Sequence, residues 1–359
     1  MPNLKQPVAG FVASAVIIAL SLGFISLFTF PTFAGWVSYY LVCVVPIQVI
    51  IGVVWGGKYP ATAAKLPQPA KGILLTLLAL AVGLIQAAVF FYTVGGRISP
   101  PTPILEHFAI VTVVTTFWIV LMFGAWPFTM VGKNPGVIGF SLLVGVWVIA
   151  YALFRAFFNY TFFRGAPFYV DKLDPKGLFM GPAALSFFLS VMFGLFLMLN
   201  FDLWPLTKSP GLMKQPVLGV VMTVLTVAIG AVASYVAIRL LHVDPMVMLA
   251  QFSVAFIFGV IVVVIMCQGS LFRTVSQPMK GILSTIVSAV IGFGLSAFYG
   301  VMHPFLSGKL ASGPPTYDYQ VWLASALLAV TFPFLSFCGF FDLWPFIRPQ
   351  KAAAPAGKR

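Results

Sequence analysis

The segment KQPVLG at residues 214–219 returns in close variants along the chain and determines how the fold is interpreted. Related segments are KQPVAG at 5–10, PQPAKG at 67–72 and SQPMKG at 276–281, with a more degenerate KNPGVIG at 133–139. Each of them stands just before a long apolar run. The segment therefore marks the start of a repeating unit, and the units begin near residues 6, 68, 134, 215 and 277.

The composition of the 359-residue chain is typical of an integral membrane protein. Hydrophobic residues make up 61% of it and charged residues 8%, with a mean hydropathy of +1.06, which is incompatible with a surface that faces water everywhere. Ten apolar runs reach the length of about 20 residues that a helix needs to cross a bilayer core of about 30 Å. They lie near 8–30, 33–55, 70–93, 105–126, 135–158, 178–200, 215–241, 245–268, 280–304 and 319–341.

The runs predict helices, because they lack the alternation of polar and apolar residues that a membrane barrel strand requires. We therefore expect an all-α integral membrane protein with about ten transmembrane helices, built as five similarly oriented two-helix hairpin repeats. Residues 1–348 form the polytopic domain, and 349–359 form a short, disordered, basic cytoplasmic tail. The repeated segments precede only odd-numbered helices, which argues against an inverted repeat.

The distribution of charge predicts the orientation. Thirteen of the 20 basic residues fall on the side of the N-terminus, together with only two of the seven acidic residues. The positive-inside rule then places both termini in the cytoplasm, and we predict a bacterial inner membrane. The basic loops are expected to contact anionic lipid head groups. Without an aromatic-lined groove or a soluble module, the sequence predicts no nucleic-acid partner.

The repeated segment has the chemistry of a helix start. Proline suits the first turn, where its missing N–H would have no partner, and the preceding Gln or Asn can satisfy neighbouring amides. Glycines follow the proline at the third and fourteenth positions, on one helix face. We expect this face to pack closely against other helices, whereas Gly177 in an external loop should tolerate substitution. The packing glycines are Gly72, Gly83, Gly219, Gly230, Gly281 and Gly292.

Polar residues inside apolar runs are candidates for a substrate site, because they are costly in lipid. The candidates are Arg155, Arg239, Gln86, Gln48 and Gln251. Two arginines near outer helix ends could hold a carboxylate or phosphate bidentately. Snorkelling of the arginines and hydrogen bonds between helices for the glutamines are the alternatives.

Two further groups of titratable residues lie at predicted helix ends. His107, His242 and His303 share an outer-end depth and are weak candidates for a metal site, although no helix presents two of them one turn apart. Asp202 and Asp342 recur in FDLWP segments at the ends of even-numbered helices, as turn residues or as paired carboxylates. No cofactor is expected, because no phosphate loop, dinucleotide fingerprint or nucleophile elbow occurs.

Three classes of function remain compatible with the sequence. The favoured class is a multi-pass transporter or facilitator for a small anionic or aromatic organic solute. The second is a membrane-anchoring subunit of a larger complex, with a protein partner or a second copy of the chain docked on it. The third and least favoured is an intramembrane enzyme on an apolar substrate. This order rests on architecture rather than on a recognised site.

Overall fold

The fold was analysed in a computed structural model, which describes residues 4–166, 169–314 and 316–347. The predicted tail at 349–359 lies outside the described residues. Ten helices are long and apolar enough to cross a membrane, which confirms the predicted number of spans and the helical membrane class. Residues 26–29, expected inside the first span, instead form its connection to the second, because the next helical segment already begins beside Pro31.

Five of the spans have between 28% and 39% of an apolar 18-residue stretch buried and are called the outer helices. Four of them follow a repeated Gln-Pro segment, and α6 begins at Pro135 of the degenerate copy. The span that begins with α8 ends in a π-helical segment, η7. The outer helices are α1 (Val8–Ile25), α4 (Ala70–Thr93), α6 (Pro135–Phe157), α8 (Val217–Ser234) with η7 (Tyr235–Leu240), and α11 (Met279–Ser307).

The other five spans have between 50% and 72% of such an 18-residue stretch buried and are called the inner helices. Three of them contain π-helical segments, whose backbone hydrogen bonds span five residues instead of the four of an α-helix. The inner helices are η1 (Thr32–Val37) with α2 (Ser38–Val49) and η2 (Ile50–Val54); α5 (Pro103–Phe117) with η3 (Trp118–Met122); α7 (Gly181–Asn200); α9 (Pro245–Val247) with η8 (Met248–Ser253), α10 (Val254–Val260) and η9 (Ile261–Met266); and α12 (Asp318–Gly339).

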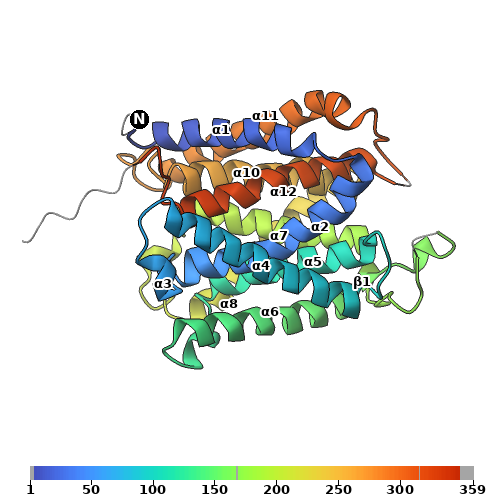
Figure 1. The fold of residues 1–359 in the computed structure, drawn as a ribbon, viewed down its shortest axis with the longest axis horizontal. Coiled ribbons are helices and arrows are strands. Elements are labelled where there is room, and N and C mark those ends of the chain that lie inside the picture. Colours follow the sequence, from blue (N-terminus) through green and yellow to red (C-terminus); the bar gives the residue numbers. More distant parts are fainter. Residues whose placement is uncertain (1–3, 167–168, 315, 348–359) are drawn as a thin grey trace, which may run out of the picture.

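The inner helices contact one another in a closed cycle. Along this cycle α2 packs on α5, α5 on α7, α7 on α10, α10 on α12, and α12 again on α2. Each outer helix packs on the inner helix that precedes it in the chain, and α1 packs on α12. Figure 1 shows α1 and α6 along opposite edges of the bundle, with α2, α5 and α7 between them. The bundle is therefore a ring of inner helices covered by outer helices.

The remaining elements lie in the connections. The side that carries the N-terminus holds α3 (Ala61–Ala64), η4 (Phe128–Met130) and η6 (Leu206–Lys208). The opposite side holds the long loop between α6 and α7, with η5 (Thr161–Phe163) and a parallel pair of strands, β1 (Phe158–Asn159) and β2 (Phe179–Met180). These two-residue strands are the only ones in the described part of the chain.

The repeated glutamine caps the outer helix that follows it, as the sequence predicted. Gln68 Oε1 accepts a hydrogen bond from the amide of Gly72 at 3.2 Å, while its Nε2 donates to the carbonyl of Phe340 beyond α12 at 2.7 Å. The proline itself occupies the N-cap position rather than the first turn, except in α6, where Asn134 is the N-cap. The equivalent caps are Gln6 on Gly10, Gln215 on Gly219 and Gln277 on Gly281.

The cap glycines allow outer helices to begin against the ends of inner helices. A Cβ atom at Gly72 would collide with the ring of Phe341, which follows α12. The same relation recurs elsewhere between a glycine of an outer helix and a residue after an inner helix, and the residue pairs are Gly139 with Trp55, Gly219 with Phe123, Gly281 with Phe201, and Gly10 with Cys267. The phenylalanines before the three Trp-Pro segments, Phe123, Phe201 and Phe341, are therefore packing partners for three of these glycines.

The glycines at the fourteenth position lie where two helices approach most closely. A Cβ at Gly83 would collide with Val44 of α2, and one at Gly230 would lie 2.8 Å from the amide nitrogen of Val191 in α7. Between α10 and α11 the contact is mutual, because a Cβ at Gly292 would meet the carbonyl of Ala255 and one at Gly259 that of Ser288. Together with the helix-start contacts, these contacts place α4, α8 and α11 each across two neighbouring inner helices.

Each inner helix ends in two consecutive residues with left-handed backbone conformation. Two of these ten residues are leucines, Leu203 with φ of 60° and Leu343 with φ of 59°. The left-handed region of backbone conformation disfavours bulky side chains. Leu343 is buried, so packing holds the unfavourable conformation in place. The left-handed pairs are Gly56 and Gly57, Gly124 and Ala125, Asp202 and Leu203, Gln268 and Gly269, and Asp342 and Leu343.

The two aspartates of the FDLWP segments belong to different ion pairs. Asp202 Oδ2 accepts from Lys280 Nζ at 2.6 Å, and Asp342 Oδ2 accepts from Lys71 Nζ at 3.0 Å. Both carboxylates are more than half exposed, so the pairs add little stability. The reading of Asp202 and Asp342 as one paired-carboxylate site is therefore wrong, and each of them joins an inner-helix end to an outer-helix start.

The expectation that Gly177 would tolerate substitution is also wrong. Its amide donates to the carbonyl of Phe158 at 2.6 Å in the strand-paired part of the loop. A Cβ atom at Gly177 would lie 2.6 Å from the amide nitrogen and 2.7 Å from the carbonyl oxygen of Phe158. A loop glycine tolerates a larger side chain only when no other atoms pack against its backbone. The backbone of Gly177 packs closely against that of Phe158.

Candidate functional site

A groove of about 710 Å³ lies between the outer helices α6 and α8, over α5 and α7. We call it the α6–α8 groove. Its size falls within the range of roughly 300–1,000 Å³ that is usual for small-molecule sites. At its rim Tyr235 is 59% exposed and Val227 40% exposed, whereas Met192 and Met122 on its floor are 3% and 0% exposed. The groove therefore opens sideways, toward the surrounding lipid.

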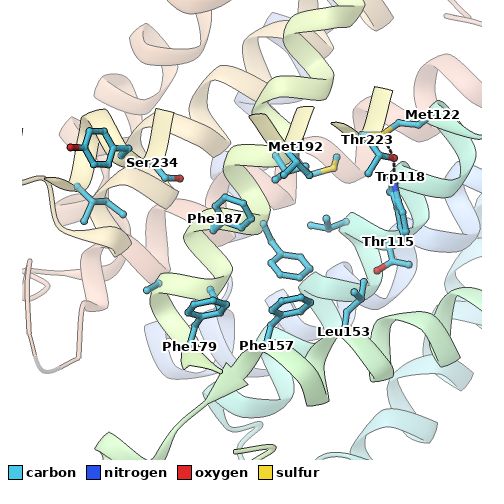
Figure 2. Close-up of a pocket in the computed structure, with 18 of the residues that line it drawn as sticks. Thr115, Trp118, Met122, Leu153, Phe157, Phe179, Phe187, Met192, Thr223 and Ser234 are labelled. Carbon is cyan, nitrogen blue, oxygen red and sulfur yellow. Dashed lines mark hydrogen bonds between the residues drawn. The ribbon is translucent and has the colours of Figure 1, made fainter. Parts of the chain in front are cut away.

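Aromatic side chains line the middle of the groove. Phe157 of α6, Phe179 of β2, and Phe187 and Phe188 of α7 surround its middle. Figure 2 shows Phe157, Phe179 and Phe187 facing the open space. Their rings present apolar faces and edges, which suit an apolar or aromatic ligand. The sequence did not single out these residues, since a phenylalanine that lines a groove has the same pattern as one that faces lipid.

One end of the groove carries polar groups that are already engaged. Trp118 Nε1 donates to Thr223 Oγ1 at 2.7 Å, and Thr223 Oγ1 in turn donates to the carbonyl of Gly219 at 2.7 Å. Figure 2 shows Trp118 and Thr223 at one end of the groove and Ser234 toward the other. This end presents little free hydrogen-bonding capacity, so a ligand would meet mainly apolar surface there.

The other end carries a cation. Arg239 lies in η7 and lines the groove together with Tyr235 and Ile238. Within the described part of the chain, Arg239 is in no ion pair, and the hydroxyl of Ser234 nearby is buried without a hydrogen-bond partner. Two π-helical segments, η3 and η7, thus border the opposite ends of one groove, and such segments often occur at functional sites.

The second predicted arginine lies in a different cavity. Arg155 occupies the last turn of α6 and lines a groove of about 390 Å³ between α4 and α6, which we call the α4–α6 groove. α6 separates the two grooves, with Leu153 and Phe157 on one side and Phe154 and Arg155 on the other. The structure therefore does not bring Arg155 and Arg239 together in one anion site.

The predicted glutamines lie in contacts between helices. Gln48 Nε2 in α2 donates to the carbonyl of Phe332 at 2.9 Å and to Ser336 Oγ at 2.7 Å, both in α12. Gln86 Oε1 in α4 accepts from Trp147 Nε1 in α6 at 3.0 Å. Gln251 is half-buried in η8. Neither groove is lined by these three residues.

The three histidines have separate environments. His107 is buried, with Nδ1 2.7 Å from the hydroxyl of Tyr160 in the long loop. His303 Nδ1 lies 2.7 Å from the carbonyl of Gly300, and His242 is exposed. Across residues 4–166, 169–314 and 316–347, no group of three or more His, Cys, Asp or Glu side chains is arranged to hold a metal ion.

No protein-family model, curated protein or solved structure matches the chain. The assignment of a function therefore rests on the chemistry of the grooves.

Proposed function

We propose that this membrane protein is a transporter or facilitator that binds an amphiphile with an anionic head and an apolar, partly aromatic body. The observation that carries the proposal is the position of Arg239, outside any described ion pair, at one end of the apolar α6–α8 groove. The groove would hold the body of the molecule, and the guanidinium group would bind its carboxylate, phosphate or sulfate.

The length of the groove supports an extended ligand. Thr223 and Arg239 line its two ends and lie on one continuous outer helix. At a rise of 1.5 Å per residue they are separated by about 24 Å along the helix axis, most of the roughly 30 Å of a bilayer core. A ligand aligned with the helix would therefore reach beyond the middle of the membrane while its head stays at the Arg239 end.

The electrostatics favour an anion over a cation. Charged side chains in lipid are costly and mark functional sites by default. Among the described residues, the only charged one that lines the groove is Arg239. Snorkelling to the interface is the rival explanation of this arginine. Snorkelling predicts no ligand dependence, so the two explanations differ in a measurable way.

The first test is uptake of pyrenebutyrate, an aromatic carboxylate, into proteoliposomes. Arg239→Gln should raise the half-saturating concentration about tenfold to hundredfold, the effect of losing a charge-assisted hydrogen bond. Arg239→Lys should restore affinity only in part, because ammonium binds a carboxylate at one point. Arg97→Gln is the matched control, since Arg97 is exposed and lies outside both grooves.

Three results of this test have distinct meanings. Equal uptake by the wild type, Arg239→Gln and Arg97→Gln would refute the role of Arg239. Uptake no greater than that of protein-free liposomes would refute transport of this probe. Saturable binding without uptake would favour the alternative of a membrane-anchoring subunit, in which the apolar groove accepts a helix of a partner.

We also propose that the ten spans are five copies of one two-helix unit. Support comes from the four glutamine caps, the five contacts between a helix-start glycine and an inner-helix end, and the five left-handed pairs that end the inner helices. Every helix-start contact links an outer helix to the inner helix three spans earlier in the chain. For the first and third spans the count continues backward from the first span to the tenth. The degenerate copy at 133–139 begins α6, the wall between the two grooves.

The proposed orientation places both termini in the cytoplasm of a bacterial inner membrane, with the side of α3 facing inward. It rests on the asymmetry of basic residues. A cysteine introduced beside Lys65 or Lys214 should resist an impermeant thiol reagent in intact cells, and one beside Lys172 or Lys309 should react. The reverse labelling pattern would overturn the orientation.

A further inference from the structure

The α4–α6 groove combines an apolar floor with a basic rim. Its floor includes Phe90 of α4 and Trp147 of α6, whose rings meet edge to face with centroids 5.4 Å apart. The indole nitrogen of Trp147 donates to Gln86 Oε1 at 3.0 Å, so the polar atom of this wall is satisfied. The cavity holds about 390 Å³ and therefore accepts part of one apolar chain.

Two cations stand at the end of this groove, on the side of the long loop. Arg155 comes from the last turn of α6, and Lys172 comes from the loop between α6 and α7. Both side chains belong to exposed residues. Neither takes part in an ion pair with any residue in the described ranges, so the rim carries two positive charges beside an apolar slot.

The carboxylates closest in sequence to Lys172 are engaged elsewhere. Asp171 pairs with Lys176 at 3.0 Å and Arg164 at 3.4 Å, and the hydrogen bond from Lys176 holds the pKa of Asp171 below its usual range. Asp174 is buried and accepts from the amides of Tyr160 at 3.0 Å and Lys176 at 2.9 Å. The two cations therefore remain available to an external anion.

We infer that the α4–α6 groove binds an anionic phospholipid, with its phosphate between Arg155 and Lys172 and one acyl chain along Phe90 and Trp147. The lipid comes from the leaflet on the side of the long loop. Arginine and lysine together suit a phosphate, since one offers a planar fork and the other a mobile point charge. The apolar slot beside them distinguishes a lipid from free phosphate. This site is separate from the α6–α8 groove and does not depend on its function.

The helix end offers a rival role for Arg155. A cation in the last turn stabilises the C-terminal carbonyls of α6 whether or not a lipid is bound. A purely structural role would change the stability of the protein but not its choice of lipid. Retention of lipid by head-group charge is therefore the measurement that separates the two roles.

The experiment uses the full chain in nanodiscs of equal phosphatidylglycerol and phosphatidylcholine, followed by detergent extraction and native mass spectrometry. The wild type should retain phosphatidylglycerol preferentially. Each basic residue near a membrane surface is worth about fivefold in affinity for an acidic lipid, so the double variant Arg155→Gln with Lys172→Gln should lose about 25-fold of the preference. Arg155→Lys in place of Arg155→Gln should recover part of it.

The control is Arg97→Gln with Lys309→Gln, which removes the same charge from exposed residues that line neither groove. This control should keep the wild-type lipid preference. Equal retention of both lipids by the wild type, or the same loss in the control, would overturn the inference. Thermal stabilisation by inorganic phosphate alone, at the level seen with phosphatidylglycerol, would also overturn it, because the acyl chain would then contribute nothing.

Discussion

Replacing Gly292 by leucine should prevent stable folding of the helix bundle. A Cβ at this position would meet the carbonyl oxygen of Ala255 in α10, and Gly259 opposite already lies against the backbone of α11. Backbone atoms cannot rotate away as the end of a side chain can, so α10 and α11 would have to separate. The expected loss is about 3 kcal/mol or more, at or above the upper end of usual overpacking costs.

The matched control is Gly294→Leu, two residues further along the same helix. A Cβ at Gly294 would have no atom within 4 Å, so this change should alter the free energy of unfolding by about 0.5 kcal/mol or less, as is usual for surface positions. The measurement is thermal unfolding in detergent together with the monodisperse yield. Similar behaviour of the two variants would mean that α10 and α11 do not touch at Gly292.

Filling the α6–α8 groove should weaken binding of the amphiphile without unfolding the protein. Ala183 is half-buried at the start of α7 and lines the groove, so an indole in its place would occupy the space between the aromatic side chains. A mismatch of a single methylene group between a ligand and a hydrophobic pocket changes discrimination between ligands by roughly tenfold or more. Ala183→Trp should therefore weaken binding of pyrenebutyrate at least about tenfold.

Ala231→Trp is the control for this variant, because Ala231 is exposed on α8 and lies outside the groove lining. It adds the same side chain at the lipid-facing surface and should leave both affinity and thermal stability close to the wild type. Unchanged affinity in Ala183→Trp, with the protein folded, would show that the ligand does not occupy this groove.

The helical spans were predictable because their signals are local. The length of an apolar run can be measured in the sequence itself. The Gln-Pro segments indicate helix starts, because the cap forms between residues four apart, as between Gln68 and Gly72. The close approach of helices at Gly83, Gly230 and Gly292 was predictable for a similar reason, since a small residue on an otherwise bulky face has few other uses in lipid.

The partners of polar residues were not predictable, because they are remote in the chain. Gln48 was a substrate-site candidate on its own helix, yet it donates to Ser336, 288 residues away. Arg155 and Arg239 had equivalent sequence contexts, and only the position of α6 places them in different grooves. The depth of a residue along a helix can be estimated from sequence, but the side of the helix that faces a groove depends on packing.

The left-handed backbone conformation at the inner-helix ends could not be predicted from the sequence either. Glycine at 56, 57 and 124 is typical of a left-handed turn, but Leu203 and Leu343 adopt the same conformation against their intrinsic preference. Their recurrence after Asp202 and Asp342 becomes meaningful only when the five ends are compared in three dimensions.

The most direct test of the α6–α8 groove as a binding site is photo-crosslinking of the wild-type protein in nanodiscs with a diazirine-bearing fatty acid. The proposal predicts adducts on groove residues such as Phe157, Phe187 and Tyr235, with competition by unlabelled fatty acid and loss of the adducts in Ala183→Trp. Adducts spread over the lipid-facing surfaces of α1 and α11 as densely as over the groove, and insensitive to the competitor, would contradict it.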